Sequence, residues 1–182
     1  MKTLFIDTHL WNINIILFDD NRILRQESVT DKKNNSEYIF PTIEKVLKND
    51  DFDNIIVVNG PGSFTGVRLG VTIAKTFAYT KNIPIRTITS LECMAISSDN
   101  KNVAIFDNNG YYVGLFNDDM SLKEDYKYLT IDEFNKLNNL ETDVTIDYEK
   151  VYEYAITKEV LDPHLVNPIY IKKIEVEKWF VK

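Results

Sequence analysis

The chain has 182 residues, of which 44% are hydrophobic and 27% charged, as is typical of a globular protein. Its formal net charge of -7 argues against direct tight binding of DNA or tRNA, because such binding depends on Lys and Arg that neutralise phosphates. No apolar run reaches the roughly 18 residues that a bilayer requires, and the beginning of the chain lacks the apolar core of a signal peptide. We therefore expect a cytoplasmic protein without contact to membranes.

The first half predicts three strands, a helix, a strand and a second helix. Short turns separate the first three strands, so these strands should form an antiparallel meander. The helix over 36–48 has Asn35 or Ser36 as its cap and contains Pro41. The expected elements are strands 2–6, 11–18 and 22–29, helix 36–48, the buried strand 54–58, helix 66–81, strand 84–88, and a short helix capped by Thr89 or Ser90.

The second half repeats this order in a shorter form. It predicts strands over 102–106, 111–116, 125–129 and 143–146, and a helix after Thr130 that includes Ile131, Phe134 and Leu137. The apolar segment 168–181 should pack on the protein. Two copies of βββαβα are the plan of the actin-like and Hsp70-like ATPase superfamily. We therefore expect an α/β fold with a lobe over 1–98 and a shortened lobe over 99–182.

The glycine-rich loop over 59–66 leaves several interpretations open. It fails as a P-loop because no Gly-Lys pair is present. Gly60, Gly62 and Gly66 follow a buried strand and precede a helix, which suits a dinucleotide loop. However, Pro61 lacks the amide that a phosphate would need, and strand 84–88 has no acidic residue for a ribose.

A third interpretation concerns the helix that follows this loop. Gly66, Gly70, Ala74 and Ala78 recur every four residues, so they form one stripe along the helix. This stripe either lets a partner helix approach closely, with apolar neighbours such as Val67, Val71 and Phe77 around it, or packs on the protein's own sheet.

Other reactive side chains do not form a recognisable catalytic set. Two histidines and one cysteine are too few for an ordinary zinc site, so we expect no metal and no cofactor. The lone Cys93 excludes an internal disulfide and is expected to be a core thiol. His9 is expected to cap a turn, and Asp107 and Asp147 are two carboxylates without a cleft.

Residues 59–79, NGPGSFTGVRLGVTIAKTFAY, resemble the signature of the TsaB family, also called YeaZ. Asp7-Thr8, Ser36-Glu37 through Pro41, and Thr89 to Glu92 also fit, and the resemblance is strong over about 35–95. The signature loop itself contains Gly60, Pro61, Gly62, Ser63, Phe64, Thr65 and Arg68.

The resemblance implies a subunit without catalytic residues of its own. TsaB-like proteins pair with the catalytic subunit TsaD, and they act with the ATPase TsaE in N6-threonylcarbamoylation of adenosine 37 of tRNA. They also form homodimers through the same face, and tRNA is reached through the complex. The segment Asp7 to Asn12 lacks the glycines of a phosphate loop, which agrees with a non-catalytic role. The alternative is an active nucleotide-binding ATPase or phosphotransferase of the same fold.

The resemblance also places the partner interface on the first two helices. We expect this interface to include Gly66, Val67, Gly70, Val71, Ala74, Phe77 and Ala78 of the second helix, with Phe40, Ile43 and Leu47 of the first.

Overall fold

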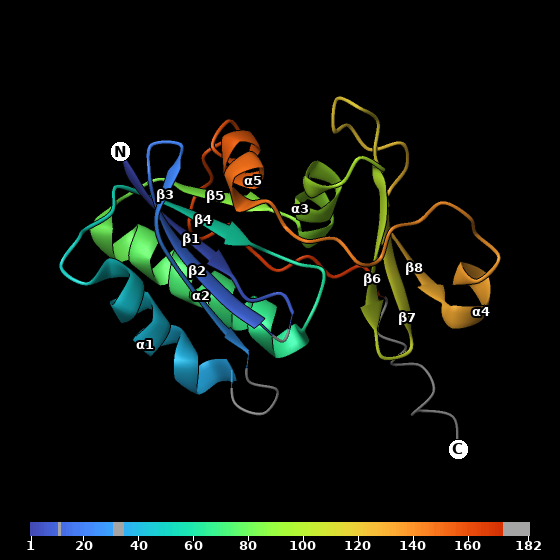
Figure 1. Ribbon diagram of the computed structural model, residues 1–182. Coiled ribbons are helices and arrows are strands. Elements are labelled where there is room, and N and C mark those ends of the chain that lie inside the picture. The colour runs from blue at the N-terminus through green and yellow to red at the C-terminus, as the bar shows by residue number, and fades with distance from the viewer. Residues whose placement is uncertain (11, 31–34, 173–182) are drawn as a thin grey trace, which may run out of the picture.

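The computed structural model describes residues 1–10, 12–30 and 35–172. It contains a five-stranded sheet and a three-stranded sheet that lie side by side (Figure 1). The first sheet has the order β3-β2-β1-β4-β5. Its first three strands pair antiparallel, which confirms the meander, and β4 and β5 continue the sheet in parallel. The strands are β1 (Lys2–Asp7), β2 (Asn12–Asp19), β3 (Arg22–Thr30), β4 (Asn54–Val58) and β5 (Ile85–Ile88).

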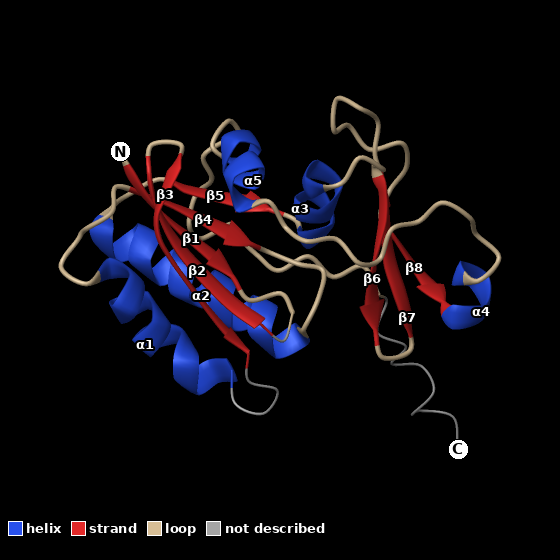
Figure 2. Ribbon diagram, viewed as in Figure 1, coloured by secondary structure: helices blue, strands red, loops and turns tan. Residues whose placement is uncertain are grey.

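Helices cover both faces of the first sheet (Figure 2). Side chains alternate along β1, so Leu4 and Ile6 belong to one core and Phe5 to another. The first core includes residues of α1 (Asn35–Leu47) and α2 (Phe64–Lys81), and the second those of α3 (Ser90–Ser97) and α5 (Tyr148–Ala155). The run over 54–58 is buried throughout because β4 packs on both faces.

The two helices after β4 and β5 begin at side-chain caps. Ser63 accepts a hydrogen bond from the backbone N–H of Gly66 at the start of α2. Thr89 and Glu92 form a reciprocal capping box at the start of α3, which confirms the cap expected there. Helix α1 begins at Asn35 and contains Pro41.

The second sheet is a meander of three antiparallel strands. These are β6 (Asn102–Asp107), β7 (Gly110–Leu115) and β8 (Lys127–Thr130). Asp107 pairs with Gly110 across a tight turn at Asn108 and Asn109. Thr130 caps α4 (Ile131–Phe134) as expected, but the helix ends before Leu137, which is exposed.

The expected strand over 143–146 is wrong. Residues 142–147 have no regular structure, and a single parallel bridge joins Val103 to Glu141 beside β6. The second half therefore keeps only βββα of the repeated order, followed directly by α5. Alternating residues over 143–146 suit a strand, but alternation does not supply a neighbouring strand to pair with.

The last part of the chain returns to the first sheet. Tyr152 of α5 stacks on Phe18 of β2, with ring centroids 4.2 Å apart. Leu161 then forms a β-bridge with Ile85 of β5, and Val166 is buried in the core between α2 and the first sheet. The prediction that 168–181 packs on the protein can be followed only to Lys172, because 173–182 lie outside the described residues. The lobe boundary at residue 98 stays a prediction.

Over the ranges that the structure describes, no helix is both long and apolar enough to cross a bilayer.

Candidate functional site

The signature loop connects β4 to α2 and forms hydrogen bonds with the start of α3. The bond between Gly60 and Pro61 is cis, and Gly60 has a φ of 100°, a region that favours glycine. The backbone N–H of Ser90 donates to the Gly60 carbonyl at 2.9 Å, and the Ser90 hydroxyl donates to the Pro61 carbonyl. This loop therefore fixes the start of α3 relative to β4.

The other side of the loop is closed by the backbone of His9. The N–H of Ser63 donates to the His9 carbonyl at 2.7 Å. A Cβ on Gly62 would lie 2.1 Å from the same oxygen, so only glycine fits there. A carbonyl oxygen thus occupies the space over the loop where a phosphate would have to approach. Because two oxygen acceptors repel each other, the geometry argues against both the P-loop and the dinucleotide interpretations.

The stripe of small residues on α2 packs on the protein's own sheet. A Cβ on Gly66 would lie 2.2 Å from the Thr8 carbonyl oxygen, and one on Gly70 would lie 2.3 Å from Thr8 Oγ1. Ala74 and Ala78 are buried in the same core. The expectation that a partner helix touches this stripe is wrong for this structure, and the alternative interpretation is correct. The small residues permit a close approach, but the neighbour is Thr8, directly after β1.

Several other expected contact residues are buried with the stripe. Val67, Val71 and Ile43 all belong to the core between the helices and the sheet. The sequence alone does not show which face of α2 meets the sheet, because apolar residues flank the stripe on both sides.

The outer face of α1 and α2 is the part of the expected interface that remains accessible. Phe40 is 55% exposed, and Leu47 and Phe77 are half-buried. Tyr38 adds a second exposed aromatic ring on α1.

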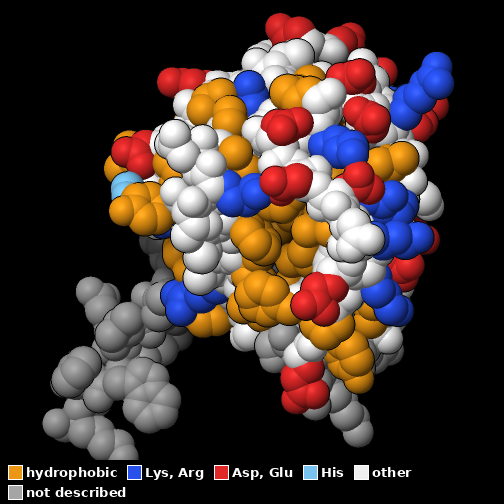
Figure 3. Space-filling model, turned by 90° about the vertical axis from the view of Figure 1, so that its left-hand side faces the viewer, with side chains coloured by type: hydrophobic (Ala, Val, Ile, Leu, Met, Phe, Trp, Pro, Cys, Tyr) orange, Lys and Arg blue, Asp and Glu red, His pale blue; other side chains and the backbone are white. Residues whose placement is uncertain are grey.

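Figure 3 looks onto the side of the molecule where α1 and one end of α2 lie, and hydrophobic side chains gather in its middle, with charged groups around them. We call these outer residues of the two helices (Tyr38, Phe40, Leu47 and Phe77) the helical face.

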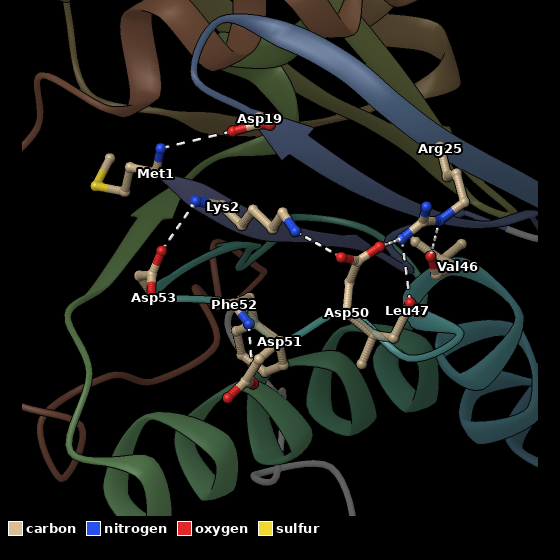
Figure 4. A network of polar contacts seen from close by, with 10 residues as sticks. All are labelled: Met1, Lys2, Asp19, Arg25, Val46, Leu47, Asp50, Asp51, Phe52 and Asp53. Carbon is tan, nitrogen blue, oxygen red and sulfur yellow. Dashed lines mark hydrogen bonds and ion pairs between the residues drawn. The ribbon is translucent and has the colours of Figure 1, made fainter.

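A polar network holds α1 in place under the sheet (Figure 4). Arg25 of β3 donates to the carbonyls of Val46 and Leu47, which are carbonyls at the end of α1. Arg25 and Lys2 both pair with the carboxylate of Asp50, the latter at 2.5 Å. These contacts link the helix end to β1 and β3, so they fix the orientation of the helical face.

Asp7 lies at the end of β1, fully buried and bound by its own chain. Its Oδ1 contacts His9 Nδ1 at 2.5 Å and the His9 N–H at 3.2 Å, and its Oδ2 accepts from the Tyr148 hydroxyl at 2.7 Å. Burial alone would raise the pKa of Asp7, but the charge of His9 and the hydrogen bonds outweigh it and lower that pKa. His9 was expected to cap a turn; it is instead a buried partner of Asp7. Neither contact of Asp7 was predicted. The one with Tyr148 joins residues that are 141 positions apart in the sequence.

The Thr89-to-Glu92 motif has a structural role. Besides the capping box, Glu92 Oε1 pairs with Lys158 Nζ at 2.6 Å, so the start of α3 is tied to the segment after α5. Cys93 is buried in the adjoining core, and burial raises the pKa of its thiol well above the ordinary value. The prediction of a core thiol is confirmed.

One cavity borders the signature loop, and a second lies at the end of β1. One of about 470 Å³ lies between loop 61–64, Val67, the β6–β7 strands and segment 168–172. The other, of about 520 Å³, lies between β1, β2 and β3 and segment 144–149. Asp107 lines the first and Asp147 the second, so these two carboxylates do not form a pair. Within the described part of the chain, no group of three His, Cys, Asp or Glu side chains is placed to hold a metal ion.

Comparisons with known proteins match this architecture. A family model described as "TsaD: tRNA N6-adenosine threonylcarbamoyltransferase" matches residues 22–107. The tRNA threonylcarbamoyladenosine biosynthesis protein TsaB of Bacillus subtilis is 38% identical over 100 residues, which are 52% of this chain and 44% of that protein. TsaB of Escherichia coli is 28% identical over 109 residues, covering 57% of this chain and 47% of that protein. Over about half of its length, the chain is thus similar to proteins of the TsaB family.

The fold agrees with this similarity across nearly the whole chain. The structure of YeaZ from Pseudomonas aeruginosa covers 93% of this chain and 99% of its own, with a TM-score of 0.75 and 17% identity. A second Pseudomonas aeruginosa structure, described as similar to peptidase YeaZ, gives a TM-score of 0.78 at 16% identity. The fold class expected from the sequence is therefore confirmed. The matched stretches span less than half the length of the TsaB relatives.

Proposed function

We propose that this chain is a TsaB-type, non-catalytic subunit that binds a TsaD-like transferase and supports N6-threonylcarbamoylation of adenosine 37 of tRNA. Similarity to TsaB proteins carries the proposal, because these relatives are named for tRNA threonylcarbamoyladenosine biosynthesis. The TsaD family model that matches residues 22–107 supports a link to that enzyme. The same proposal includes a TsaE-like ATPase as a further partner and a homodimer of this chain. It also includes a cytoplasmic location and contact with tRNA only through the complex.

The local chemistry supports a role without catalysis by this chain. Both carboxylate oxygens of Asp7 are held by His9 and Tyr148, so both are already engaged in contacts inside the fold. The space over the signature loop is filled by the His9 carbonyl, which leaves no amide cradle for a phosphate. What the chain offers a partner is an apolar surface on α1 and α2.

The proposed contact is the helical face rather than the buried stripe. Phe40 and Tyr38 protrude from α1, and burial of apolar area is the main driving force of association. A stable pair should bury at least about 1,000 Å² in total. Gly70→Trp would not test this contact, since even a Cβ at that position would collide with Thr8.

The test is size-exclusion chromatography and titration calorimetry with the TsaD-like subunit of the same genome. We expect Phe40→Glu to weaken pairing at least tenfold, because it places a charge in the apolar contact. Phe106→Glu is the matched control: Phe106 is 54% exposed on the second sheet, against 55% for Phe40, and its change should leave pairing intact. Equal affinity of the two variants would refute the helical face as the interface.

The alternative function, an ATPase or phosphotransferase, is tested by the same titration calorimetry. Titration of the chain alone with MgATP should give no heat of binding in the micromolar range. Tight binding with turnover would replace the proposed function by this alternative.

A further inference from the structure

We infer that the cavity between loop 61–64 and segment 168–172 binds a small organic anion with an apolar body, whose charged group is held by Arg68. This site is independent of pairing with a transferase, so it goes beyond the proposed function. The inference rests on the walls of the cavity, on the contacts of Arg68, and on the charges around it.

The walls form a space of the size that small molecules occupy. The volume of about 470 Å³ falls within the range of roughly 300–1,000 Å³ typical of ligand sites. Pro61, Phe64 and Val67 line one side, and Ile169 and Tyr170 another. Apolar and aromatic walls of this kind favour an aromatic or branched aliphatic body.

Arg68 does not itself line the cavity, but it contacts two of the rings that do. Its guanidinium carbon is 3.7 Å from the centroid of Phe64 and 5.4 Å from that of Tyr170. Its Nε donates to the Tyr170 hydroxyl at 2.6 Å. These contacts orient the planar group and leave its terminal N–H groups for a ligand.

The charges near the rim favour an anion. Among the described residues, Arg68 contacts rings and a hydroxyl but no carboxylate, although the protein as a whole carries a net charge of -7. Asp107, the acidic residue of the lining, already pairs with Lys172 at 3.6 Å and accepts from the Tyr112 hydroxyl at 3.3 Å. An oriented arginine that contacts no carboxylate of the described residues, and that stacks on the rings of an apolar cavity, is suited to bind a carboxylate or phosphate through two parallel hydrogen bonds.

The experiment uses the full chain and three probes with the same aromatic body: phenylacetate, phenyl phosphate and phenethylamine. Binding is followed by NMR titration of backbone amides. We expect shifts of residues 61–64 and 168–172 with at least one anion, and at least tenfold weaker binding of the cationic phenethylamine. The tighter of the two anions identifies the preferred charged group. Equal binding of the amine, or shifts confined to other surfaces, would overturn the inference.

Variants at two exposed arginines distinguish a specific role of Arg68 from the effect of lowering the positive charge of the protein. Arg68→Gln should weaken the preferred anion at least tenfold, because the paired hydrogen bonds are lost. Arg68→Lys should have an intermediate effect, since it keeps the charge but not the planar group. The control is Arg22→Gln, an exposed arginine on β3, for which we expect less than a twofold change. Unchanged affinity of Arg68→Gln would refute the role of Arg68.

Discussion

Replacing Gly70 by alanine should destabilise the protein, although alanine is the better helix former. Gly70 lies within α2, where its α-carbon faces the end of β1. A Cβ there would lie 2.3 Å from Thr8 Oγ1, which is closer than side-chain atoms normally approach. That hydroxyl also donates to the Gly66 carbonyl at 2.7 Å, so it cannot move away without losing a buried hydrogen bond.

The magnitude follows from three opposing effects. Overpacking of a close contact costs about 1–3 kcal/mol, and loss of the Thr8 hydrogen bond costs about 1 kcal/mol more. The change from glycine to alanine inside a helix returns about 1 kcal/mol. We therefore expect the free energy of unfolding of Gly70→Ala to fall by about 1–3 kcal/mol.

A double-mutant cycle isolates the contact with Thr8. In a Thr8→Ala background the hydroxyl is absent, and the remaining neighbours of the new Cβ, in Ile6 and Thr8, lie at an ordinary 3.5 Å. There Gly70→Ala should be neutral or stabilise by up to about 1 kcal/mol. Urea unfolding followed by circular dichroism gives all four free energies, and we expect a coupling of about 2 kcal/mol.

Equal destabilisation by Gly70→Ala in both backgrounds would refute this reasoning. It would mean that the cost comes from elsewhere along α2 and not from the approach of the helix to β1.

Two further predictions concern groups buried below α5 and α3. Tyr148→Phe should lower the free energy of unfolding by about 1.5–3 kcal/mol, because it removes a hydrogen bond to a buried carboxylate. The pKa of Asp7 is lowered in the folded state, so its contribution is present above the ordinary pKa of 3.8 and declines as the pH falls below it. The difference between wild type and Tyr148→Phe in urea titrations should therefore shrink in acid; a difference that grows in acid would contradict this. The thiol of Cys93 should react with an aromatic disulfide reagent only as fast as the protein opens, because it is buried and its pKa is raised. Rapid labelling of the native protein would disprove its burial.

Local patterns in the sequence were sufficient for most elements of the first sheet. The continuous apolar run over 54–58 indicated a strand buried on both faces, and Thr89 with Glu92 indicated a capping box. Both features depend on residues that are near one another in the chain. The helix over 148–155 was missed, although Asp147 as a cap and Val151, Tyr152 and Ala155 on one face would have indicated it.

Features that depend on distant contacts could not be predicted. The small residues of α2 suit close packing against either a partner or the sheet, and only the position of Thr8 decides between them. The buried group of Asp7, His9 and Tyr148 joins residues from opposite ends of the chain. Phe40, by contrast, remained exposed as the proposed interface requires, because it lies on the side of α1 that faces away from β2 and β3.

The placement of α5 limits how this protein can be divided. Most of the stretch that the TsaD family model matches, 22–107, lies in the first half of the chain, yet one face of the sheet in that half is covered by residues 148–155. A fragment ending at residue 98 would leave Phe5, Phe18 and Ile56 without that cover, and so expose a large apolar surface to water. Deletion studies of the signature region should for this reason retain the distal helix, because cutting the molecule at its midpoint would strip Val151, Tyr152 and Ala155 from the core that they share with the first sheet.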